Sequence, residues 1–212
     1  MSFIGKKLVF LGDSGVGKSC MITRFLTGVY DNTILATNGA SYASKTIEIP
    51  EIGKSITLDI WDTAGQEKYK SLNKFFYQDA KMVILVYDKT QKYSFDNLKN
   101  NWYKDLKEYG DPNIVIGIAG SKSDRYEEEA VSEQEAREFA KSIDAVFGLT
   151  SAQNNTGIDE LFKELGKKFL TLNHSGIESD IQKQEPKQNI KLDGNNVAKK
   201  NEEQKKKKKN PC

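Results

Sequence analysis

Short apolar runs alternate along this chain with longer segments whose apolar residues recur at helical spacing. The run and segment pairs are Lys7–Leu11 with Ser19–Leu26, Met82–Tyr87 with Ser94–Tyr109, Ile114–Ala119 with Ser132–Ser142, and Ala145–Leu149 with Ile158–Leu170. Runs that are apolar throughout are typical of parallel strands buried on both faces. The alternation predicts an α/β fold, in which a largely parallel sheet has helices on both faces. Trp102, in the second helical segment, is expected to pack in the core.

One segment departs from this alternation and predicts a hairpin. Two β-rich stretches, Ser44–Ile49 and Ser55–Trp61, flank the turn-forming sequence Pro50-Glu51-Ile52-Gly53. Because so short a turn joins antiparallel neighbours, the mostly parallel sheet is expected to carry one antiparallel edge strand.

The composition changes after Leu172 and divides the chain into a domain and a tail. Asn, Gln, Lys, Glu, Ser and Gly replace the periodic apolar residues there, so the segment cannot bury enough surface to offset its ordering entropy. We expect one folded domain over residues 1–172 and a disordered basic tail over residues 173–212. A length of 212 residues suits one domain of ordinary size with a tail.

Charge is distributed unevenly between these two parts. The tail holds ten lysines and six acidic residues, a net charge of +4, whereas residues 1–172 hold 22 basic and 24 acidic residues, a net charge of −2. The domain is not expected to bind nucleic acid, which requires a clustered positive face. No apolar run approaches the roughly 20 residues of a membrane-spanning helix. The two cysteines, Cys20 and Cys212, favour the cytosol over an oxidising compartment.

A phosphate-binding pattern, GxxxxGK followed by Ser or Thr, is matched by Gly12-Asp13-Ser14-Gly15-Val16-Gly17-Lys18-Ser19 between a predicted strand and a predicted helix. In that setting main-chain N–H groups and the helix N-terminus point at phosphates. The Lys18 ammonium is expected to meet the β- and γ-phosphates in a catalytic role, and the Ser19 hydroxyl to hold Mg²⁺. The predicted nucleotide contacts here are Ser14, Gly15, Val16, Gly17, Lys18, Ser19 and Cys20.

A second group of polar residues follows the second hairpin strand. The sequence Asp62-Thr63-Ala64-Gly65-Gln66 begins at the carboxyl end of that strand, where ligands bind in such sheets. Asp62 could hold Mg²⁺ through a water, Gly65 could offer its N–H to a γ-phosphate, and Gln66 could orient the attacking water. These roles favour GTP hydrolysis over the chemistry of an ATPase or a small-molecule kinase.

The base-reading residues are expected after the strand Ile114–Ala119. The Asp124 carboxylate can accept two hydrogen bonds from the N1–H and exocyclic amine of guanine, which adenine cannot supply. Lys122 would lay its aliphatic stem over the ring. Main-chain groups of Ser151 and Ala152 would meet the base O6, and Ser121 completes the predicted base site.

Taken in order, GDSGVGKS, WDTAGQEKY, LVYD and TSA resemble the motifs of Ras-like small GTPases, and their flanks are similar to the Rab branch. The resemblance covers about residues 6–172 and implies a P-loop NTPase fold with a six-stranded sheet. It also implies a molecular switch that binds GTP or GDP with Mg²⁺ and hydrolyses GTP slowly without an activating protein.

The resemblance assigns further residues to function. A threonine that closes on Mg²⁺ and the γ-phosphate corresponds to Thr37, and Tyr30 would pack edge-on against the base. An aromatic triad that Rab proteins display to effectors corresponds to Tyr42, Trp61 and Phe76. The alternative interpretation is that these three are half-exposed core aromatics.

Three residues depart from the Rab pattern. Ser121 stands where Rab-like proteins have asparagine, Gln153 where they have lysine, and Asn38 where an apolar residue is usual. Because that asparagine reads the base edge and braces the phosphate loop, we expect looser guanine-nucleotide binding and faster exchange than in typical relatives. The phosphate site itself is expected to be intact.

Partners and a location also follow from the resemblance. The protein is expected to be a monomer that acts in vesicle trafficking. Its expected partners are an exchange factor, a GTPase-activating protein, a GDP-dissociation inhibitor and effectors. Lys205–Lys209 would be attracted to anionic lipid, and Cys212 is expected to be prenylated. The cytoplasmic protein would then lie on the cytosolic face of endomembranes. The alternative is a solvated charge run with an inert thiol.

Two alternatives to a hydrolytic switch stay open on the sequence. The first is a divergent interaction module that binds nucleotide weakly, with little or no GTP hydrolysis, and it is motivated by Ser121, Gln153 and Asn38. The second is a P-loop kinase or ATPase, which Asp124 and the Gly65-Gln66 pair disfavour.

Overall fold

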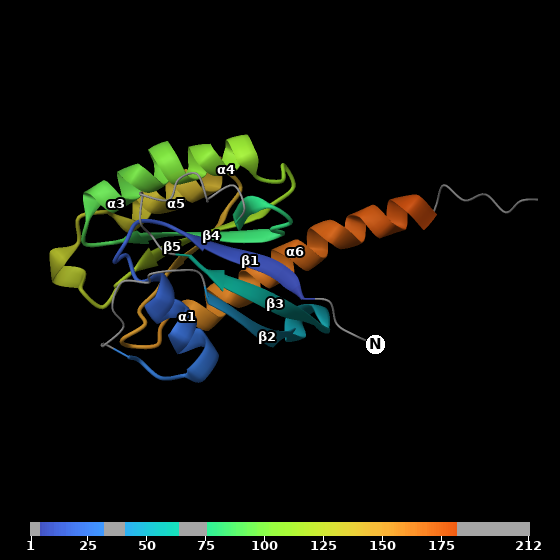
Figure 1. Ribbon diagram of the computed structural model, residues 1–212, viewed down its shortest axis with the longest axis horizontal. Helices are drawn as coiled ribbons and strands as arrows, with labels where there is room; N and C mark the ends of the chain where they lie inside the picture. Colours follow the sequence, from blue (N-terminus) through green and yellow to red (C-terminus); the bar gives the residue numbers. More distant parts are fainter. Residues whose placement is uncertain (1–4, 32–40, 64–75, 182–212) are drawn as a thin grey trace, which may run out of the picture. The chain divides into compact units, whose positions relative to one another are not determined.

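Helices and strands alternate along the chain as the apolar pattern predicts (Figure 1). The structure, a computed structural model, describes residues 5–31, 41–63 and 76–181, with side chains through residue 173. Its strands are β1 (Lys6–Leu11), β2 (Ser41–Ile49), β3 (Lys54–Asp62), β4 (Met82–Asp88), β5 (Val115–Ser121) and β6 (Val146–Leu149). Its helical elements are α1 (Lys18–Thr27), η1 (Pro50–Ile52), α3 (Lys92–Asn97), η3 (Leu98–Trp102), α4 (Tyr103–Tyr109), η4 (Tyr126–Glu128), α5 (Glu133–Ser142) and α6 (Ile158–Ile181).

The strands form one six-stranded sheet in the order β2-β3-β1-β4-β5-β6. β1 pairs in parallel with β3 on one side and with β4 on the other, and β5 and β6 extend the parallel part. β2 pairs antiparallel with β3, from Ser41 opposite Asp62 to Ile49 opposite Lys54. The predicted mostly parallel sheet with one antiparallel edge strand is confirmed.

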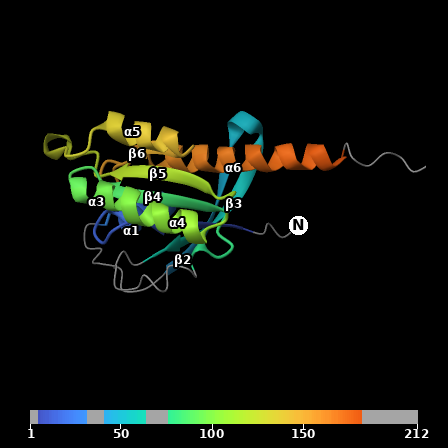
Figure 2. The same cartoon turned by 90° about the horizontal axis from the view of Figure 1, so that it is seen from above.

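Alternate residues of the strands contribute to two apolar clusters, one on each face of the sheet. Leu8 and Phe10 of β1 belong to the cluster under α1 and α6, whereas Val9 and Leu11 belong to the cluster under α3, η3, α4 and α5. Figure 1 shows these two groups of helices on either side of the sheet, and Figure 2 shows α3, α4 and α5 running along the strands. Every residue of β4 is buried because helices cover both of its faces.

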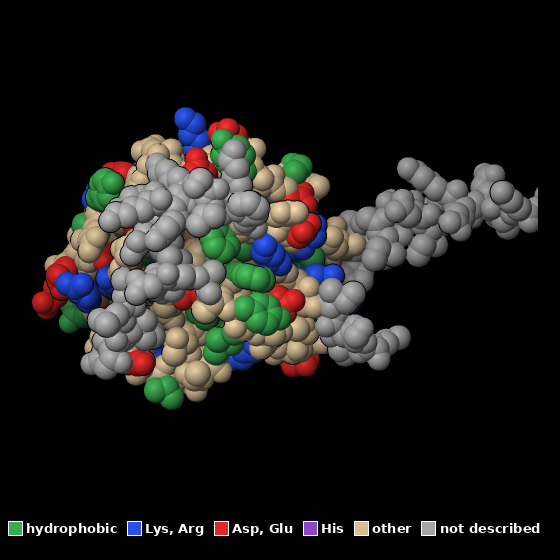
Figure 3. Space-filling view, in the orientation of Figure 1, with side chains coloured by type: hydrophobic (Ala, Val, Ile, Leu, Met, Phe, Trp, Pro, Cys, Tyr) green, Lys and Arg blue, Asp and Glu red, His purple; other side chains and the backbone are tan. Residues whose placement is uncertain are grey.

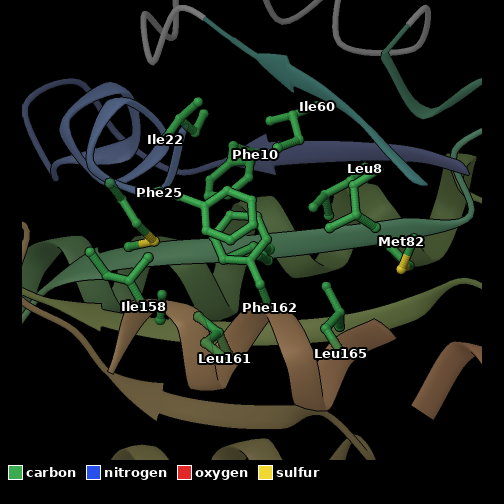
Figure 4. Packing of buried hydrophobic residues seen from close by; sticks show 14 of the residues in the cluster. Leu8, Phe10, Ile22, Phe25, Ile60, Met82, Ile158, Leu161, Phe162 and Leu165 are labelled. Atoms are coloured by element: carbon green, nitrogen blue, oxygen red, sulfur yellow. The ribbon is translucent and has the colours of Figure 1, made fainter. Parts of the chain in front are cut away.

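Three aromatic rings lie at the centre of the cluster under α1 and α6. The ring of Phe25 on α1 stacks on that of Phe162 on α6 with centroids 3.6 Å apart, and the ring of Phe10 lies 5.8 Å from that of Phe162. Figure 4 shows the three side chains meeting between the two helices and β1. Because α1 begins at the phosphate loop, this packing fixes the loop relative to the sheet.

The helical segment after β4 contains a turn that periodicity does not reveal. The sequence predicts one helix over Ser94–Tyr109, whereas the structure has α3, then a π-helical turn, η3, and then α4. In this turn the N–H of Tyr103 donates to the carbonyl of Leu98, five residues earlier. Apolar burial keeps the three- and four-residue spacing of an α-helix across the turn, at Phe95, Leu98, Trp102 and Leu106.

The last helix extends beyond the predicted end of the domain. α6 runs to Ile181 and so continues into residues 173–181 of the predicted tail; residues 182–212 lie outside the described ones, and the predicted disorder of the tail stays a prediction. The chain divides into two units, residues 1–174 and 175–212. Within the described residues, no helix has both the length and the apolar character that a membrane span requires.

We predict that Phe162→Ala lowers the free energy of unfolding by about 3–5 kcal/mol, because it removes the ring that contacts Phe10 and Phe25 and leaves a cavity. Urea denaturation at fixed nucleotide and Mg²⁺ concentrations measures the change. Leu172→Ala, at a side chain that is 54% exposed, is the matched control and should stay within about 0.5 kcal/mol of wild type. Equal losses in the two variants would contradict this description of the core.

Candidate functional site

The carboxyl ends of the parallel strands meet at one edge of the sheet. β1 pairs with strands on both sides, so the loop after Leu11 begins where the strand order reverses. Ligands of open α/β sheets bind at such a switch point. Asp62, Asp88 and Ser121 end β3, β4 and β5 at this same edge. The predicted phosphate, Mg²⁺ and base residues are therefore brought to one place by the topology.

Two glycines give the phosphate loop its shape. Gly12 has a φ of 147°, and a Cβ at this position would lie 2.2 Å from the carbonyl oxygen of Val86. Gly17 has a φ of 100°, in the left-handed region that favours glycine, and forms the N-cap of α1. Because glycine has no side chain, Gly17 cannot cap the first N–H groups of α1. Exposed N–H groups at a helix N-terminus are an established arrangement for binding phosphate.

The side chain of Lys18 folds back along the same loop. Its ammonium donates to the carbonyl oxygens of Gly12, at 2.9 Å, and Asp13, at 2.8 Å, and the residue is only 5% exposed. Burial lowers the pKa of Lys18 to about 8, while the negative charges of Asp62 and Asp13 raise it. A buried cation at a helix N-terminus attracts an anion strongly.

Asp62 and Ser19 lie beside Lys18, as the predicted Mg²⁺ site requires. Asp62 is buried, and in the described part of the chain its Oδ1 atom has no hydrogen-bond partner. Burial raises the pKa of the Asp62 carboxyl, whereas a hydrogen bond with Ser19 and the charge of Lys18 lower it. The next residue, Thr63, donates its hydroxyl to the carbonyl of Phe10 at 2.6 Å, which fixes the end of β3 against β1.

A cavity of about 250 Å³ adjoins the phosphate loop. It joins α1, the end of β5 and the loop after β6, which are far apart in the sequence. Seven predicted nucleotide contacts line it: Gly17, Cys20, Tyr30, Ser121, Lys122, Asp124 and Ala152. The other four lining residues are Met21, Arg125, Thr150 and Gln153. Predicted base contacts thus surround a real cavity beside the predicted phosphate contacts.

Two buried side chains fix the orientation of the charged base-site residues. The Lys122 ammonium lies 2.7 Å from Oδ2 of Asp88, which is fully buried at the end of β4. The hydroxyl of Ser151, also buried, donates to Oδ1 of Asp124 at 2.5 Å. Ser151 was predicted to offer its main chain to the base, and its side chain adds a second role. The ion pair of Asp88 with Lys122 was not predicted, because the sequence alone does not indicate which residue a carboxylate at a strand end will pair with.

Ser121, the residue that departs from the Rab pattern, still contacts the phosphate loop. Its hydroxyl lies 2.5 Å from the carbonyl oxygen of Val16 and 2.8 Å from that of Tyr87. A hydroxyl carries one hydrogen, so it donates to one of these two carbonyls at a time. The side chain is buried and carries no amide. Serine therefore preserves a brace to the loop but provides no second polar group for the base.

Four predicted site residues cannot be placed. Thr37, Gly65, Gln66 and Cys212 lie outside the described residues, as does the divergent Asn38. The predicted γ-phosphate contacts and the lipidation site therefore stay predictions.

Two members of the predicted aromatic triad are in contact. The rings of Tyr42 and Trp61 lie edge to face with centroids 5.5 Å apart, on the paired strands β2 and β3. Tyr42 is exposed, whereas Trp61 and Phe76 are partly buried against the cluster under α3 and α5. Figure 3 shows hydrophobic side chains close together on the face where Figure 1 draws β3. Tyr42 is thus available at the surface, whereas Trp61 and Phe76 contribute in part to core packing.

Arg24 on α1 is a contact that the sequence did not suggest. Its guanidinium donates through Nε to the carbonyl of Ala152 at 2.6 Å and through a terminal nitrogen to the carbonyl of Gln153 at 2.7 Å. The other terminal nitrogen donates to the carbonyl of Gly28 at 2.6 Å. Arg24 therefore connects the loop after β6, which we call the base loop, to α1, the helix that begins at the phosphate loop. Its partners are main-chain atoms, which leave no pattern in the sequence.

A larger cavity, of about 690 Å³, lies elsewhere. It opens near the amino end of β5, between α4 and α6, with Leu106, Ile116 and Lys168 in its wall. None of the predicted site residues lines it. Volume alone therefore does not locate the site, whereas the convergence of charged and main-chain groups does.

This chain is similar to proteins of one family. The family model described as Ras family matches residues 7–171. Ras-related protein Rab-22A of Homo sapiens is 43% identical over 164 residues, which cover 77% of this chain and 82% of that protein. Ras-related protein Rab-31 of Homo sapiens is 42% identical over the same length. Ras-related protein Rab-13 of Canis lupus familiaris is 36% identical over 194 residues, which cover 91% of this chain and 94% of that protein.

We predict that Arg24→Ala accelerates release of a fluorescent guanine nucleotide, mant-GDP, by at least about 10-fold, because hydrogen bonds from a charged group contribute about 1.5–3 kcal/mol each. Arg24→Lys should also release mant-GDP faster than wild type, because one ammonium cannot make the separate hydrogen bonds that the guanidinium makes. Stopped-flow fluorescence measures the rates. Arg137→Ala removes an exposed arginine remote from the cavity and serves as the control. Release of Arg24→Ala at the wild-type rate would show that the base loop needs no clamp.

Proposed function

This chain belongs to the Rab branch of the Ras family of small GTPases, and on that premise we propose that its phosphate loop and adjoining cavity hold GTP or GDP together with Mg²⁺. It is a GTP hydrolase and a nucleotide-dependent switch in membrane trafficking. The observation that carries the nucleotide site is the buried ammonium of Lys18 at the N-terminus of α1. A polyphosphate would bring the negative charge that this position favours.

The residues near Lys18 fit a magnesium ion. Asp62 offers a buried carboxylate oxygen without a hydrogen-bond partner in the described residues, and the Ser19 side chain contacts the same carboxyl. Among the described residues no cluster of three or more His, Cys, Asp or Glu exists, which suits a cation that keeps several waters and phosphate oxygens as ligands. Ser19 and Thr37 would hold the ion directly and Asp62 through a water. Bound there, Mg²⁺ would neutralise charge on the phosphates.

The cavity supports a preference for guanine. Asp124 presents a carboxylate whose Oδ1 is held by Ser151, and a guanine N1–H and amine would complete its hydrogen bonds. The Lys122 stem would lie along the base while Asp88 holds its ammonium. Tyr30, which lines the cavity, would pack against the base edge. Adenine has no pair of donors to match Asp124.

Hydrolysis would depend on residues beyond the described part together with Lys18. We assign orientation of the attacking water to Gln66 and the γ-phosphate contacts to Thr37 and Gly65, whose segments would relax after hydrolysis. The sequence contains three arginines. Each is engaged away from Lys18: Arg24 with main-chain carbonyls, Arg125 with Glu128 and Arg137 with Glu133. We therefore expect slow hydrolysis that an activating protein accelerates by supplying the missing cation.

Partners and location follow from the family. Exchange factors, activating proteins, a GDP-dissociation inhibitor and effectors would recognise the two nucleotide states, with Tyr42, Trp61 and Phe76 on the effector face. We propose that the protein is monomeric and lies on the cytosolic face of endomembranes. Lys205–Lys209 and a prenylated Cys212 would supply the attachment.

Nucleotide extracted from the purified protein tests the proposed function. We expect GDP or GTP in near-stoichiometric amount on chromatography, and GTP hydrolysis that stops in the Lys18→Ala variant. Protein with no nucleotide would favour a divergent interaction module. Adenine nucleotide would favour a kinase or ATPase. Either result would overturn the assignment.

We predict that Ser121→Asn slows mant-GDP release by about 5- to 30-fold, which corresponds to about 1–2 kcal/mol for a regained polar contact with the base. The amide would reach both the base edge and the phosphate loop, which the single Ser121 hydroxyl cannot do. Ser123→Asn, two residues along the same loop, is the matched control and should leave the rate unchanged. If Ser121→Asn released nucleotide as fast as wild type, serine would not be the cause of weak base binding.

A further inference from the structure

One carboxylate ties the phosphate loop to the helical layer on the opposite face of the sheet from α1. Oδ1 of Asp13 accepts a hydrogen bond from Nε1 of Trp102 at 2.7 Å and another from Nδ2 of Asn97. These donors stand 89 and 84 positions later in the sequence. Oδ2 of Asp13 is buried and has no hydrogen-bond partner among the described residues. The orientation of this carboxylate therefore depends on the two donors.

The π-helical turn explains how residues five positions apart reach the same oxygen. In an α-helix each residue turns by about 100°, so residues five apart point about 140° away from each other. Asn97 precedes η3 and Trp102 ends it, and the bond from the N–H of Tyr103 to the carbonyl of Leu98 widens the turn between them. A wider turn brings the fifth residue back toward the direction of the first. Such turns occur frequently at functional sites.

Asp13 also contacts the lysine that would bind phosphate. Its main-chain carbonyl accepts the hydrogen bond from the Lys18 ammonium at 2.8 Å, and its negative charge acts on that ammonium as well. A side chain anchored at Oδ1 restricts the main chain of its own residue. The two donors on the helical layer therefore restrict a carbonyl that sets the position of Lys18.

The indole of Trp102 depends on this contact in turn. Trp102 is 6% exposed and packs in the cluster with Phe95, Leu98 and Leu106. A buried indole N–H needs an acceptor, and Asp13 is the acceptor that the structure shows. Core packing accounts for the ring, as the sequence predicts, but it does not account for the direction of the N–H.

We propose that Trp102 and Asn97 are positioning residues of the phosphate loop, which act through Asp13 on Lys18 and thereby slow nucleotide release. The inference rests on the proposed function, because the loop must hold phosphate for its geometry to affect release. The π-helical turn is then a part of the nucleotide site that lies outside every motif of the sequence.

The test is the rate of mant-GDP and mant-GTP release from full-length protein. Trp102→Phe keeps an aromatic ring in the core but removes the N–H donor together with part of the indole, and we expect release about 5- to 30-fold faster. Tyr103→Phe, at the next residue, is the matched control and should release at the wild-type rate. Circular dichroism of the nucleotide-bound variants should superimpose on wild type, which separates the loss of the contact from a loss of folding.

A double-mutant cycle distinguishes positioning from a structural effect. Asp13→Ala alone should also accelerate release, and adding Trp102→Phe to Asp13→Ala should produce no further change, because the acceptor is already gone. Asn97→Asp should accelerate release through repulsion of two carboxylates, and adding Asp13→Asn in the same chain should slow release part of the way back to the wild-type rate. Independent, multiplicative effects of Asp13→Ala and Trp102→Phe would overturn the inference.

Failure of the inference and failure of the proposed function give different results. Wild-type protein that binds no guanine nucleotide would remove the function itself. Wild-type protein that binds mant-GDP while Trp102→Phe releases it at an unchanged rate would remove only the positioning role.

Discussion

The ammonium of Lys18 is buried in the phosphate loop, where it donates hydrogen bonds to two main-chain carbonyl oxygens. Burying a cation is costly unless negative charge is close, and here Asp62 and Asp13 supply it from separate segments. The loop must hold its carbonyls in place, α1 must start directly after the loop, and β3 must end beside it. Much of the local structure can be understood as meeting these conditions.

The sheet topology brings the necessary groups together. The phosphate loop follows β1, a central strand of the sheet. Asp62 ends β3 on one side of β1, and Asp88 and Ser121 end β4 and β5 on the other side. Contacts across the site then connect these segments: Asp88 to Lys122, Ser121 to the carbonyl of Val16, and Arg24 to the loop after β6. The phosphate and base halves are thus fastened to each other through α1 and β5, which is how a change in one half can affect the other.

The sequence predicts the parts of this arrangement that leave a pattern of residue types. Apolar runs predict the buried strands, the turn-forming residues Pro50–Gly53 predict the hairpin, and the glycines with Lys18 and Ser19 identify the phosphate loop. The π-helical turn leaves no pattern, because Leu98, Trp102 and Leu106 keep α-helical spacing through it. The continuation of α6 to Ile181 was missed because the apolar residues at helical spacing that identify this helix end at Leu170.

Contacts of polar groups were harder to predict than the elements that carry them. Arg24 binds main-chain carbonyls, and Asp88 binds a lysine 34 positions later, so neither contact follows from the identity of a neighbouring residue. Trp102 was expected to pack, and it does, but only the structure shows where its N–H points. Ser121 was predicted to weaken the base site, and the structure adds that it keeps a contact with the phosphate loop.

A crystal structure of the protein with a non-hydrolysable GTP analogue and Mg²⁺ would test the role of Lys18 most directly. The expected result is that the Lys18 ammonium lies within about 3.2 Å of oxygens on the β- and γ-phosphates, a normal hydrogen-bond distance, with the metal between Ser19 and Asp62. A nucleotide bound elsewhere, or phosphates beyond the reach of Lys18 while its ammonium stays on the carbonyls of Gly12 and Asp13, would contradict that role.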